Sequence, residues 1–236
     1  MPINNILCTI CARSGSKGIK NKNFILVNNK PLISYTINQA KLSKIFDDIV
    51  LSSDSDQIVN IAKKNKIEIF FKRKSNLSND KSGKIEVIRD ALLESEKYYN
   101  KKYDYIIDLD VTSPLRSVDD IKNAFNLFLQ KNYDILFSVS DSRKNPYFNL
   151  VEVKNSGQIK LVKTRNSKFL RRQDAPKCYD MNASIYIWRR SALLKYKSLF
   201  VKNTGIYIMP EERSIDIDTP LDLEIVSFLL RKKKYD

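Results

Sequence analysis

Four cations and two glycines stand close together near the start of the chain, in the segment ARSGSKGIKNKN at residues 12–23. No acidic residue lies among them, and the apolar run ILCTIC comes directly before them. Gly15 and Gly18 would let backbone amides approach an anion without a Cβ in the way. Their spacing fits neither the Walker A pattern nor G-x-G-x-x-G. So many cations suit a nucleoside triphosphate better than a dinucleotide, and we predict a triphosphate site here; the alternative is a solvated basic loop.

Two pairs of aspartates are the second chemical feature. Asp108 and Asp110 end the run YIIDLD, and Asp216 and Asp218 lie in SIDIDTP. Residues two apart in a strand share a face, so each pair can present two carboxylates together. Burying such a pair is costly unless a cation joins it, and Mg²⁺ carrying phosphate oxygens is the usual one. Together with the basic loop, the pairs favour a magnesium–nucleotide site; each alone could instead cap a helix and face solvent.

The chain contains no histidine, which excludes Ser-His and Cys-His nucleophilic mechanisms. Any general base must then be a carboxylate, a lysine or a metal-bound hydroxyl. Three cysteines, Cys8, Cys11 and Cys178, are too few and odd in number for a disulfide framework. Cys8 and Cys11 are three apart in a strand-like run, so their side chains would face opposite sides and not easily share a metal. We expect them to pack in or beside the core.

The charge of the chain is strongly positive. The excess is +15 at neutral pH, which favours polyanionic partners such as nucleic acids, acidic membranes, or phosphorylated and carboxylated small molecules. No apolar run approaches the ~18 residues of a membrane span. The N-terminus MPINNILCTI has no basic region ahead of its short apolar run, so it resembles a first strand more than a secretory signal. We expect a cytoplasmic protein without a membrane partner.

The elements that must position these residues alternate along the first 140 residues, a pattern typical of a parallel sheet covered by helices. Apolar runs predict strands at 6–11, 48–53, 67–71, 104–110 and 133–140, and helical periodicity predicts helices at 31–46, 55–65, 84–98 and from Ser117 onward. A further strand at 179–188, a short strand at 206–209 and a terminal helix at 220–232 complete the core. The basic loop then follows the first strand, at the edge where open α/β sheets bind ligands.

A hairpin interrupts the alternation. Residues 148–154 and 158–163 alternate with period two around the turn Asn155-Ser-Gly157. We predict an α/β, Rossmann-like, mostly parallel sheet with helices on both faces, formed by residues 1–140 and 178–236. Residues 141–177 would form an inserted lid or dimerisation element.

Several motifs, in order along the chain, resemble those of the CMP-sialic acid synthetase (N-acylneuraminate cytidylyltransferase) family. They are ARSGSKGIKNKN at 12–23, FKR at 71–73, TSPLR at 112–116, RRQDAP at 171–176, MNASIYIW at 181–188 and DIDTPLDL at 216–223. The forms DLDVTSPLR and CYDMNASIYIW resemble more narrowly the members that activate legionaminic acid, a bacterial relative of sialic acid.

The resemblance implies a nucleotide-diphospho-sugar transferase type of fold and transfer of CMP from CTP to the anomeric hydroxyl of a nonulosonic acid, with Mg²⁺ and release of pyrophosphate. The positions that match nucleotide-binding residues of the family are Arg13, Ser14, Gly15, Ser16, Lys17, Gly18, Lys22, Asn23, Arg73 and Ser82. Asp216 and Asp218 match the metal ligands, and with Arg13 and Lys22 they make up the expected catalytic set. Asp216, Asp218 and a metal-bound species all remain candidates for the general base.

The resemblance also implies a sugar site and a dimer. The expected sugar contacts are Asp110, Arg116, Arg172 and Asn182. The family commonly has Gln at the position of Asp110, so this residue is either a sugar contact or a further metal ligand. Family members form homodimers through the inserted element, and Arg172 would then bind the sugar carboxylate in the neighbouring subunit.

Two other classes of protein remain open from the residues alone. A nucleotide-sugar glycosyltransferase could use the D-x-D of Asp108 and Asp110 to hold Mg²⁺ on a diphosphate. A nucleic-acid-binding protein would explain the charge, but the sequence shows no helix-turn-helix, zinc module or RNA-binding aromatic strand, so we expect no nucleic-acid partner.

Overall fold

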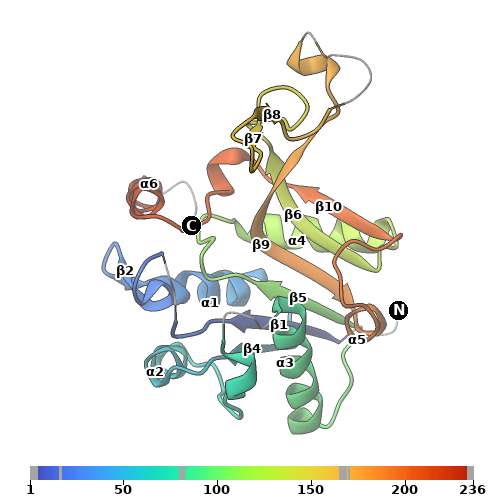
Figure 1. The fold of residues 1–236 in the computed structure, drawn as a ribbon. Coiled ribbons are helices and arrows are strands. Elements are labelled where there is room, and N and C mark those ends of the chain that lie inside the picture. The colour runs from blue at the N-terminus through green and yellow to red at the C-terminus, as the bar shows by residue number, and fades with distance from the viewer. Residues whose placement is uncertain (1–4, 16–17, 80–82, 165–168, 170, 233–236) are drawn as a thin grey trace.

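The computed structural model describes residues 5–15, 18–79, 83–164, 169 and 171–232, with the side chain of Arg172 left out (Figure 1). Among these residues, no helix is both long and apolar enough to cross a lipid bilayer.

A six-stranded sheet forms the centre of the molecule, in the order β10-β6-β9-β5-β1-β4. The strands are β1 (Ile6–Cys11), β4 (Asp48–Ser52), β5 (Tyr105–Leu109), β6 (Ile135–Asp141), β9 (Tyr179–Arg189) and β10 (Thr204–Ile208). β1 pairs in parallel with β4 and β5, and β6 pairs in parallel with β10. β9 runs antiparallel to both of its neighbours. The predicted mostly parallel sheet is confirmed.

Helices cover both faces of the sheet (Figure 1). They are α1 (Leu32–Ser43), α2 (Asp56–Lys64), α3 (Lys84–Tyr99), α4 (Val118–Gln130), α5 (Arg190–Lys195) and α6 (Pro220–Arg231). The apolar faces of α1, α2, α4 and α6 join one core cluster, and those of α3 and α5 join the other. The continuous apolar runs of β1 and β5 are explained by this burial on both sides.

Local sequence signals fix where several of these helices begin. The Ser117 hydroxyl accepts a hydrogen bond from the amide of Asp120, and the Asp120 carboxylate accepts one from the amide of Ser117, which is the predicted capping box of α4. Thr219 and Asp222 form the same arrangement at the start of α6.

The predicted strand at 67–71 is wrong. These residues have no strand partner; instead the ring of Phe70 stacks on Tyr98 of α3, with centroids 4.2 Å apart, and Ile67 is buried. Their apolar side chains thus cover a helix and do not extend the sheet. The sequence reading also missed α5 and a short antiparallel pair, β2 (Leu26–Val27) with β3 (Lys30–Pro31).

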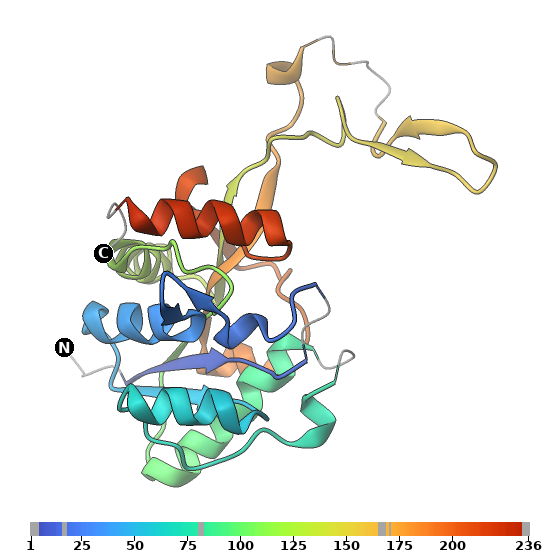
Figure 2. The same cartoon turned by 90° about the vertical axis from the view of Figure 1, so that its left-hand side faces the viewer.

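The predicted hairpin is present as β7 (Val151–Val153) paired with β8 (Ile159–Leu161). Figure 2 shows it extending well away from the sheet and its covering helices. Its strands are exposed, with Val153 and Ile159 each 67% accessible. The boundaries 141–177 of an inserted element remain a prediction.

Candidate active site

A pocket of about 440 Å³ opens beside the carboxyl end of β1. Because β1 lies between β4 and β5 in parallel register, the segments that leave these three strands converge there. The residues that line it are Cys11, Arg13, Gly15, Gly18, Lys22, Asn23, Arg73, Leu77, Asn79, Lys84, Val87, Asp110, Thr112 and Asp218. Most of the predicted nucleotide-binding positions that the structure describes are therefore brought to one cavity.

The basic loop passes very close to the aspartate pair near the C-terminus. A Cβ placed on Gly18 would lie 2.5 Å from the carbonyl oxygen of Asp218, whereas one on Gly15 would meet nothing within 4 Å. Any side chain at position 18 would thus clash with the backbone of Asp218, so glycine is required there. Asn23, which is 8% exposed, closes the loop from the other end, since its side-chain amide donates to the carbonyl of Arg13 at 2.9 Å.

The first turn of the basic loop is held by Asp54, a residue that was not predicted from the sequence to belong to the site. The amide and the hydroxyl of Ser14 both donate to the carboxylate of Asp54, each at 2.8 Å. Burial would raise the pKa of Asp54, but the bonds from Ser14 outweigh it and lower the pKa below its usual value. The amide of Ser14, predicted to contact the triphosphate, is therefore already paired in this conformation.

The two aspartates after β10 differ in their surroundings. The Asp218 carboxylate lies 2.8 Å from the Lys22 ammonium, and its side chain is 71% exposed. Asp216 is more enclosed, and its Oδ1 is buried without a hydrogen-bond partner. Burial, opposed by a hydrogen bond from Thr112 and aided by the charges of Asp110 and Asp218, raises the pKa of Asp216 to about 6. An unpaired buried carboxylate oxygen beside other acids is a suitable ligand for a cation.

The Asp108 and Asp110 side chains share a face, as predicted, but a lysine lies against both. The Lys84 ammonium is 2.6 Å from Asp110 Oδ2 and 3.2 Å from Asp108 Oδ2. Burial would raise the pKa of Asp110, but Lys84 and the bonds from Thr112 outweigh it and lower the pKa to about 2. Asp110 is therefore a poor proton acceptor at neutral pH.

Arg73 lies at the predicted place. It lines the pocket, and its guanidinium donates to the hydroxyl and the carbonyl of Ser52 at 3.0 and 2.6 Å. The end of β4 thus orients this arginine, which is 7% exposed.

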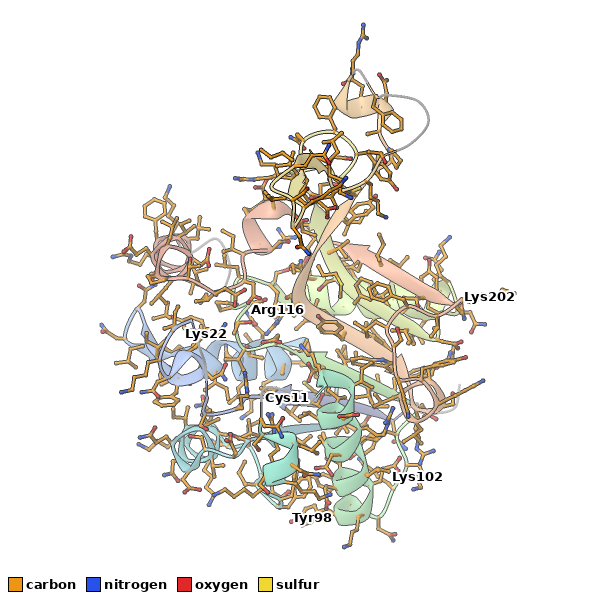
Figure 3. The ribbon with its side chains drawn as sticks, viewed as in Figure 1. Cys11, Lys22, Tyr98, Lys102, Arg116 and Lys202 are labelled. Atoms are coloured by element: carbon orange, nitrogen blue, oxygen red, sulfur yellow. The ribbon has the colours of Figure 1, made fainter. Side chains whose placement is uncertain are left out.

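The predicted direct sugar contact of Arg116 disagrees with its position. The side chain is fully buried, and its guanidinium donates to the carbonyl of Ser184, the hydroxyl of Thr36 and the carbonyl of Asp110 (Figure 3). These bonds tie β9, α1 and the end of β5 together beneath the pocket. Arg116 therefore supports the site from below and does not line the pocket, and its predicted sugar contact stays a prediction.

Asn182, also predicted as a sugar contact, is buried, and its predicted role stays a prediction. It is 4% exposed, and its side-chain amide donates to the hydroxyl of Ser214 at 3.0 Å. Its carbonyl oxygen accepts from the hydroxyl of Ser138 at 2.7 Å. Asn182 thus connects β9 to β6 and to the segment that carries Asp216, and does not face the pocket.

Some predicted residues lie outside the described part of the chain. Ser16, Lys17 and Ser82 belong to this group, and for Arg172 only the backbone is described, in a short 3₁₀ helix at Arg172–Asp174. Their predicted roles stay predictions. The cysteines have the expected places: none is in a disulfide, Cys8 is buried in the core, and Cys11 borders the pocket.

One missed residue left a signal in the sequence. Lys84 is the first residue of α3, where the helix dipole disfavours a cation. A lysine at that place suggests that nearby carboxylates compensate, which Asp108 and Asp110 do. Asp54 left no comparable signal, because only the loop conformation brings it to Ser14.

Known proteins resemble the chain over almost its whole length. The sequence model of a family described as cytidylyltransferase matches residues 7–233. The chain is 51% identical over 231 residues to a Campylobacter coli protein named post-translational flagellin modification protein B, covering 98% of this chain and 97% of that one. It is 50% identical over 228 residues to the Campylobacter jejuni CMP-N,N'-diacetyllegionaminic acid synthase, covering 97% and 96% of the two chains.

A solved structure shares the fold. The CMP:2-keto-3-deoxy-manno-octonic acid synthetase complexed with CTP superposes with a TM-score of 0.71 at 15% identity, covering 98% of this chain and all of that one. At this identity the likeness concerns the fold.

Proposed function

Because the chain belongs to the cytidylyltransferase family, we propose that it joins CMP from CTP to the anomeric hydroxyl of a nonulosonic acid and releases pyrophosphate. It is a nucleotidyltransferase, and the acid is of the legionaminic or sialic type. Legionaminic acid is the favoured substrate because the relative of that name is 50% identical over almost the whole chain.

The observation that carries this proposal is the meeting of the basic loop with the carboxylate of Asp218 in one pocket. Arg13 and Lys22 follow β1, Arg73 follows α2, and Asp218 lies 196 residues after Lys22, yet all four line the same cavity. Cations suit the triphosphate of CTP, and an acidic pair beside them suits the metal that accompanies it.

In the reaction, the anomeric oxygen of the acid attacks the α-phosphorus of CTP, and the bond from that phosphorus to the bridging oxygen of pyrophosphate breaks. Negative charge then builds on the phosphoryl oxygens and on the leaving group. Arg13 and Lys22 stabilise that charge, with the described amides of the loop and Asn23 holding its shape. The hydroxyl proton leaves to a base other than Asp110, since Lys84 and the bonds from Thr112 lower the pKa of that carboxyl to about 2 and make it a weak base.

The residues present fit a magnesium ion. Within the described residues, no three Cys, Asp or Glu side chains are grouped closely enough to enclose a metal by themselves. Mg²⁺ commonly takes only one or two protein carboxylates and completes its shell with phosphate oxygens and water. Asp216 and Asp218 would hold it, and Oδ1 of Asp216 lacks any other partner. When bound, the ion would neutralise the charge that develops on the phosphates.

A homodimer completes the proposal. The hairpin β7–β8 stands apart from the core, and Val151, Val153 and Ile159 expose apolar side chains on one face of it. An isolated two-stranded hairpin is marginally stable in water, so a second copy of the chain would stabilise it. In that arrangement Arg172 would reach the sugar site of the neighbouring subunit.

The glycosyltransferase alternative loses its main support. The ammonium of Lys84 already neutralises the D-x-D pair, Asp108 and Asp110, to which that class of enzyme would bind its metal ion. The decisive experiment is Mg²⁺-dependent release of pyrophosphate from CTP, with legionaminic, sialic, pseudaminic and 3-deoxyoctulosonic acids offered in parallel. We expect release with a nonulosonic acid and the highest kcat/KM with the legionaminic type. Absence of release with all four acids would refute the proposal.

A further inference from the structure

Lys84 lies between two pockets of the molecule. Lys84 lines the pocket of about 440 Å³ described above, here called the nucleotide pocket. It also lines a second pocket of about 250 Å³. The ammonium lies against Asp108 and Asp110 and 4.1 Å from the centre of the Tyr186 ring. The lysine is therefore fixed on one side by two carboxylates and on the other by an aromatic face.

Three of the four oxygens of the carboxylate pair beside Lys84 have a hydrogen-bond partner, and the fourth, Asp108 Oδ2, has only the charge of the Lys84 ammonium 3.2 Å away. Asp108 Oδ1 accepts from the hydroxyl of Thr9 at 2.8 Å, and Asp110 Oδ1 accepts from the amide and the hydroxyl of Thr112 at 3.1 and 3.0 Å. The two Oδ2 atoms are those that face Lys84. A metal ion at the two Oδ2 atoms would compete with the Lys84 ammonium, which already faces both of them.

Burial makes the lysine necessary. The side chain of Asp108 is 1% exposed and that of Asp110 is 22% exposed. Two carboxylates this close and this enclosed would repel each other and lose hydration, and they stay ionised only if a cation offsets that cost. The two carboxylates in turn raise the pKa of Lys84 against the effect of its burial, so the ammonium stays charged.

The second aspartate pair, Asp216 and Asp218, has no lysine that contacts both carboxylates among the ion pairs of the described residues. Oδ1 of Asp216 is buried without a partner, and Asp218 is largely exposed and contacts Lys22. One pair therefore shares a lysine that contacts both carboxylates, whereas in the other pair Lys22 contacts Asp218 and Oδ1 of Asp216 has no hydrogen-bond partner.

We propose that Lys84 is a built-in counter-cation that keeps metal ions from Asp108 and Asp110, so that, of the two aspartate pairs that the structure describes, only Asp216 and Asp218 bind the metal that accompanies the nucleotide. The inference rests on the proposed function, because it concerns the metal that accompanies CTP. A D-x-D pattern usually indicates that a metal ion neutralises the two aspartates. Here Lys84 does so and holds Asp108 and Asp110 in place.

The test counts bound metal directly. Binding of CTP to the full chain is first measured by calorimetry; then Mn²⁺ is titrated into the protein–CTP complex, and free Mn²⁺ is followed by electron paramagnetic resonance. We expect one bound Mn²⁺ per chain in the native protein and in Asp110→Asn. Lys84→Met should bind two, and Lys84→Arg, which retains the charge, should bind one.

The control is Lys74→Met. Lys74 also bridges two carboxylates, those of Asp90 and Glu94, but does not line the pocket, so this variant should bind one Mn²⁺. If Lys84→Met unfolds, Lys84→Gln replaces it, with the melting temperature as the check. Two Mn²⁺ in the native protein and one in Asp110→Asn would overturn the inference, as would one Mn²⁺ in a folded Lys84→Met. Failure of CTP to bind at all would instead count against the proposed function.

Discussion

The ammonium of Lys22 lies 2.8 Å from Oδ1 of Asp218, although 196 residues separate them in the chain. Lys22 belongs to the basic loop after β1, and Asp218 belongs to the segment before α6. Their contact joins the part of the site that suits the triphosphate to the part that suits the metal. Lys22 is only 15% exposed, so this geometry is supported by its surroundings.

Replacing Lys22 should reduce catalysis without unfolding the protein. We expect Lys22→Met to lower kcat/KM for CTP by about 10², the usual effect of removing one group that stabilises a developing oxyanion. Lys20→Met is the matched control, because Lys20 belongs to the same loop but does not line the pocket. Steady-state kinetics on both variants provide the measurement; equal losses would show that only the overall charge of the loop matters.

Gly18 and Gly15 should respond differently to alanine. A Cβ on Gly18 would lie 2.5 Å from a backbone oxygen of Asp218, which cannot move as a flexible side chain would. We expect Gly18→Ala to lower the free energy of unfolding by about 1–3 kcal/mol. Gly15→Ala, with open space around it, should change it by less than about 0.5 kcal/mol. Denaturant titration decides, and similar values for both would contradict the close contact.

Arg116→Met should act on stability and not on the affinity for the acid. The substitution removes the charged donor that the buried oxygens of Ser184, Thr36 and Asp110 share, although the two carbonyls keep a second donor each. We expect a loss of about 3 kcal/mol or more in unfolding free energy. A raised KM for the acid in a variant of native stability would restore the sugar contact predicted from sequence.

The pH dependence of stability should reveal Asp120. Its carboxylate accepts two hydrogen bonds from the guanidinium of Arg213, at 2.8 and 3.0 Å, which fixes the segment leading to Asp216 onto α4. Burial alone would raise the pKa of Asp120, but the bonds from Arg213 and Ser117 outweigh it and lower the pKa. The stabilisation is therefore fully present above the unfolded pKa of about 3.9 and is lost as pH falls toward the lower folded pKa.

The corresponding variant is Asp120→Asn. We expect it to be less stable than the native protein by about 3 kcal/mol at pH 7. The difference should shrink as the pH is lowered below about 4. Unfolding curves for both proteins across that range give the measurement, and a difference independent of pH would exclude this role of the ionised carboxylate.

The hairpin should control assembly. We expect Val153→Lys combined with Ile159→Lys to convert a dimer to a monomer in sedimentation experiments, because both side chains are 67% exposed on the same face of the hairpin. The control is Glu152→Gln. Glu152 lies between Val151 and Val153 in β7, so its side chain points to the opposite face of the hairpin and its replacement should leave the dimer intact. A native protein that sediments as a monomer would contradict the proposed dimer.

Most elements of the core could be predicted from local patterns. The apolar runs of β1 and β5 and the capping boxes at Ser117 and Thr219 are signals that a few neighbouring residues carry by themselves. The strand predicted at 67–71 is absent because of a contact made only in the tertiary structure. An apolar run of five residues can pair with a strand or cover a helix, and here the ring of Tyr98 is the partner that Phe70 meets.

The sequence alone determined the types of side chain that this protein can use: a basic loop with two glycines, two aspartate pairs and no histidine. It also determined most of the strands and helices of the core, because periodicity and capping are local properties. Tertiary structure decided which charges meet. Lys22 contacts Asp218, Lys84 neutralises Asp108 and Asp110, and Arg116 is buried beneath the pocket. These contacts join distant segments, and burial, which sets the cost of an unpaired charge, exists only once the sheet and its helices are assembled.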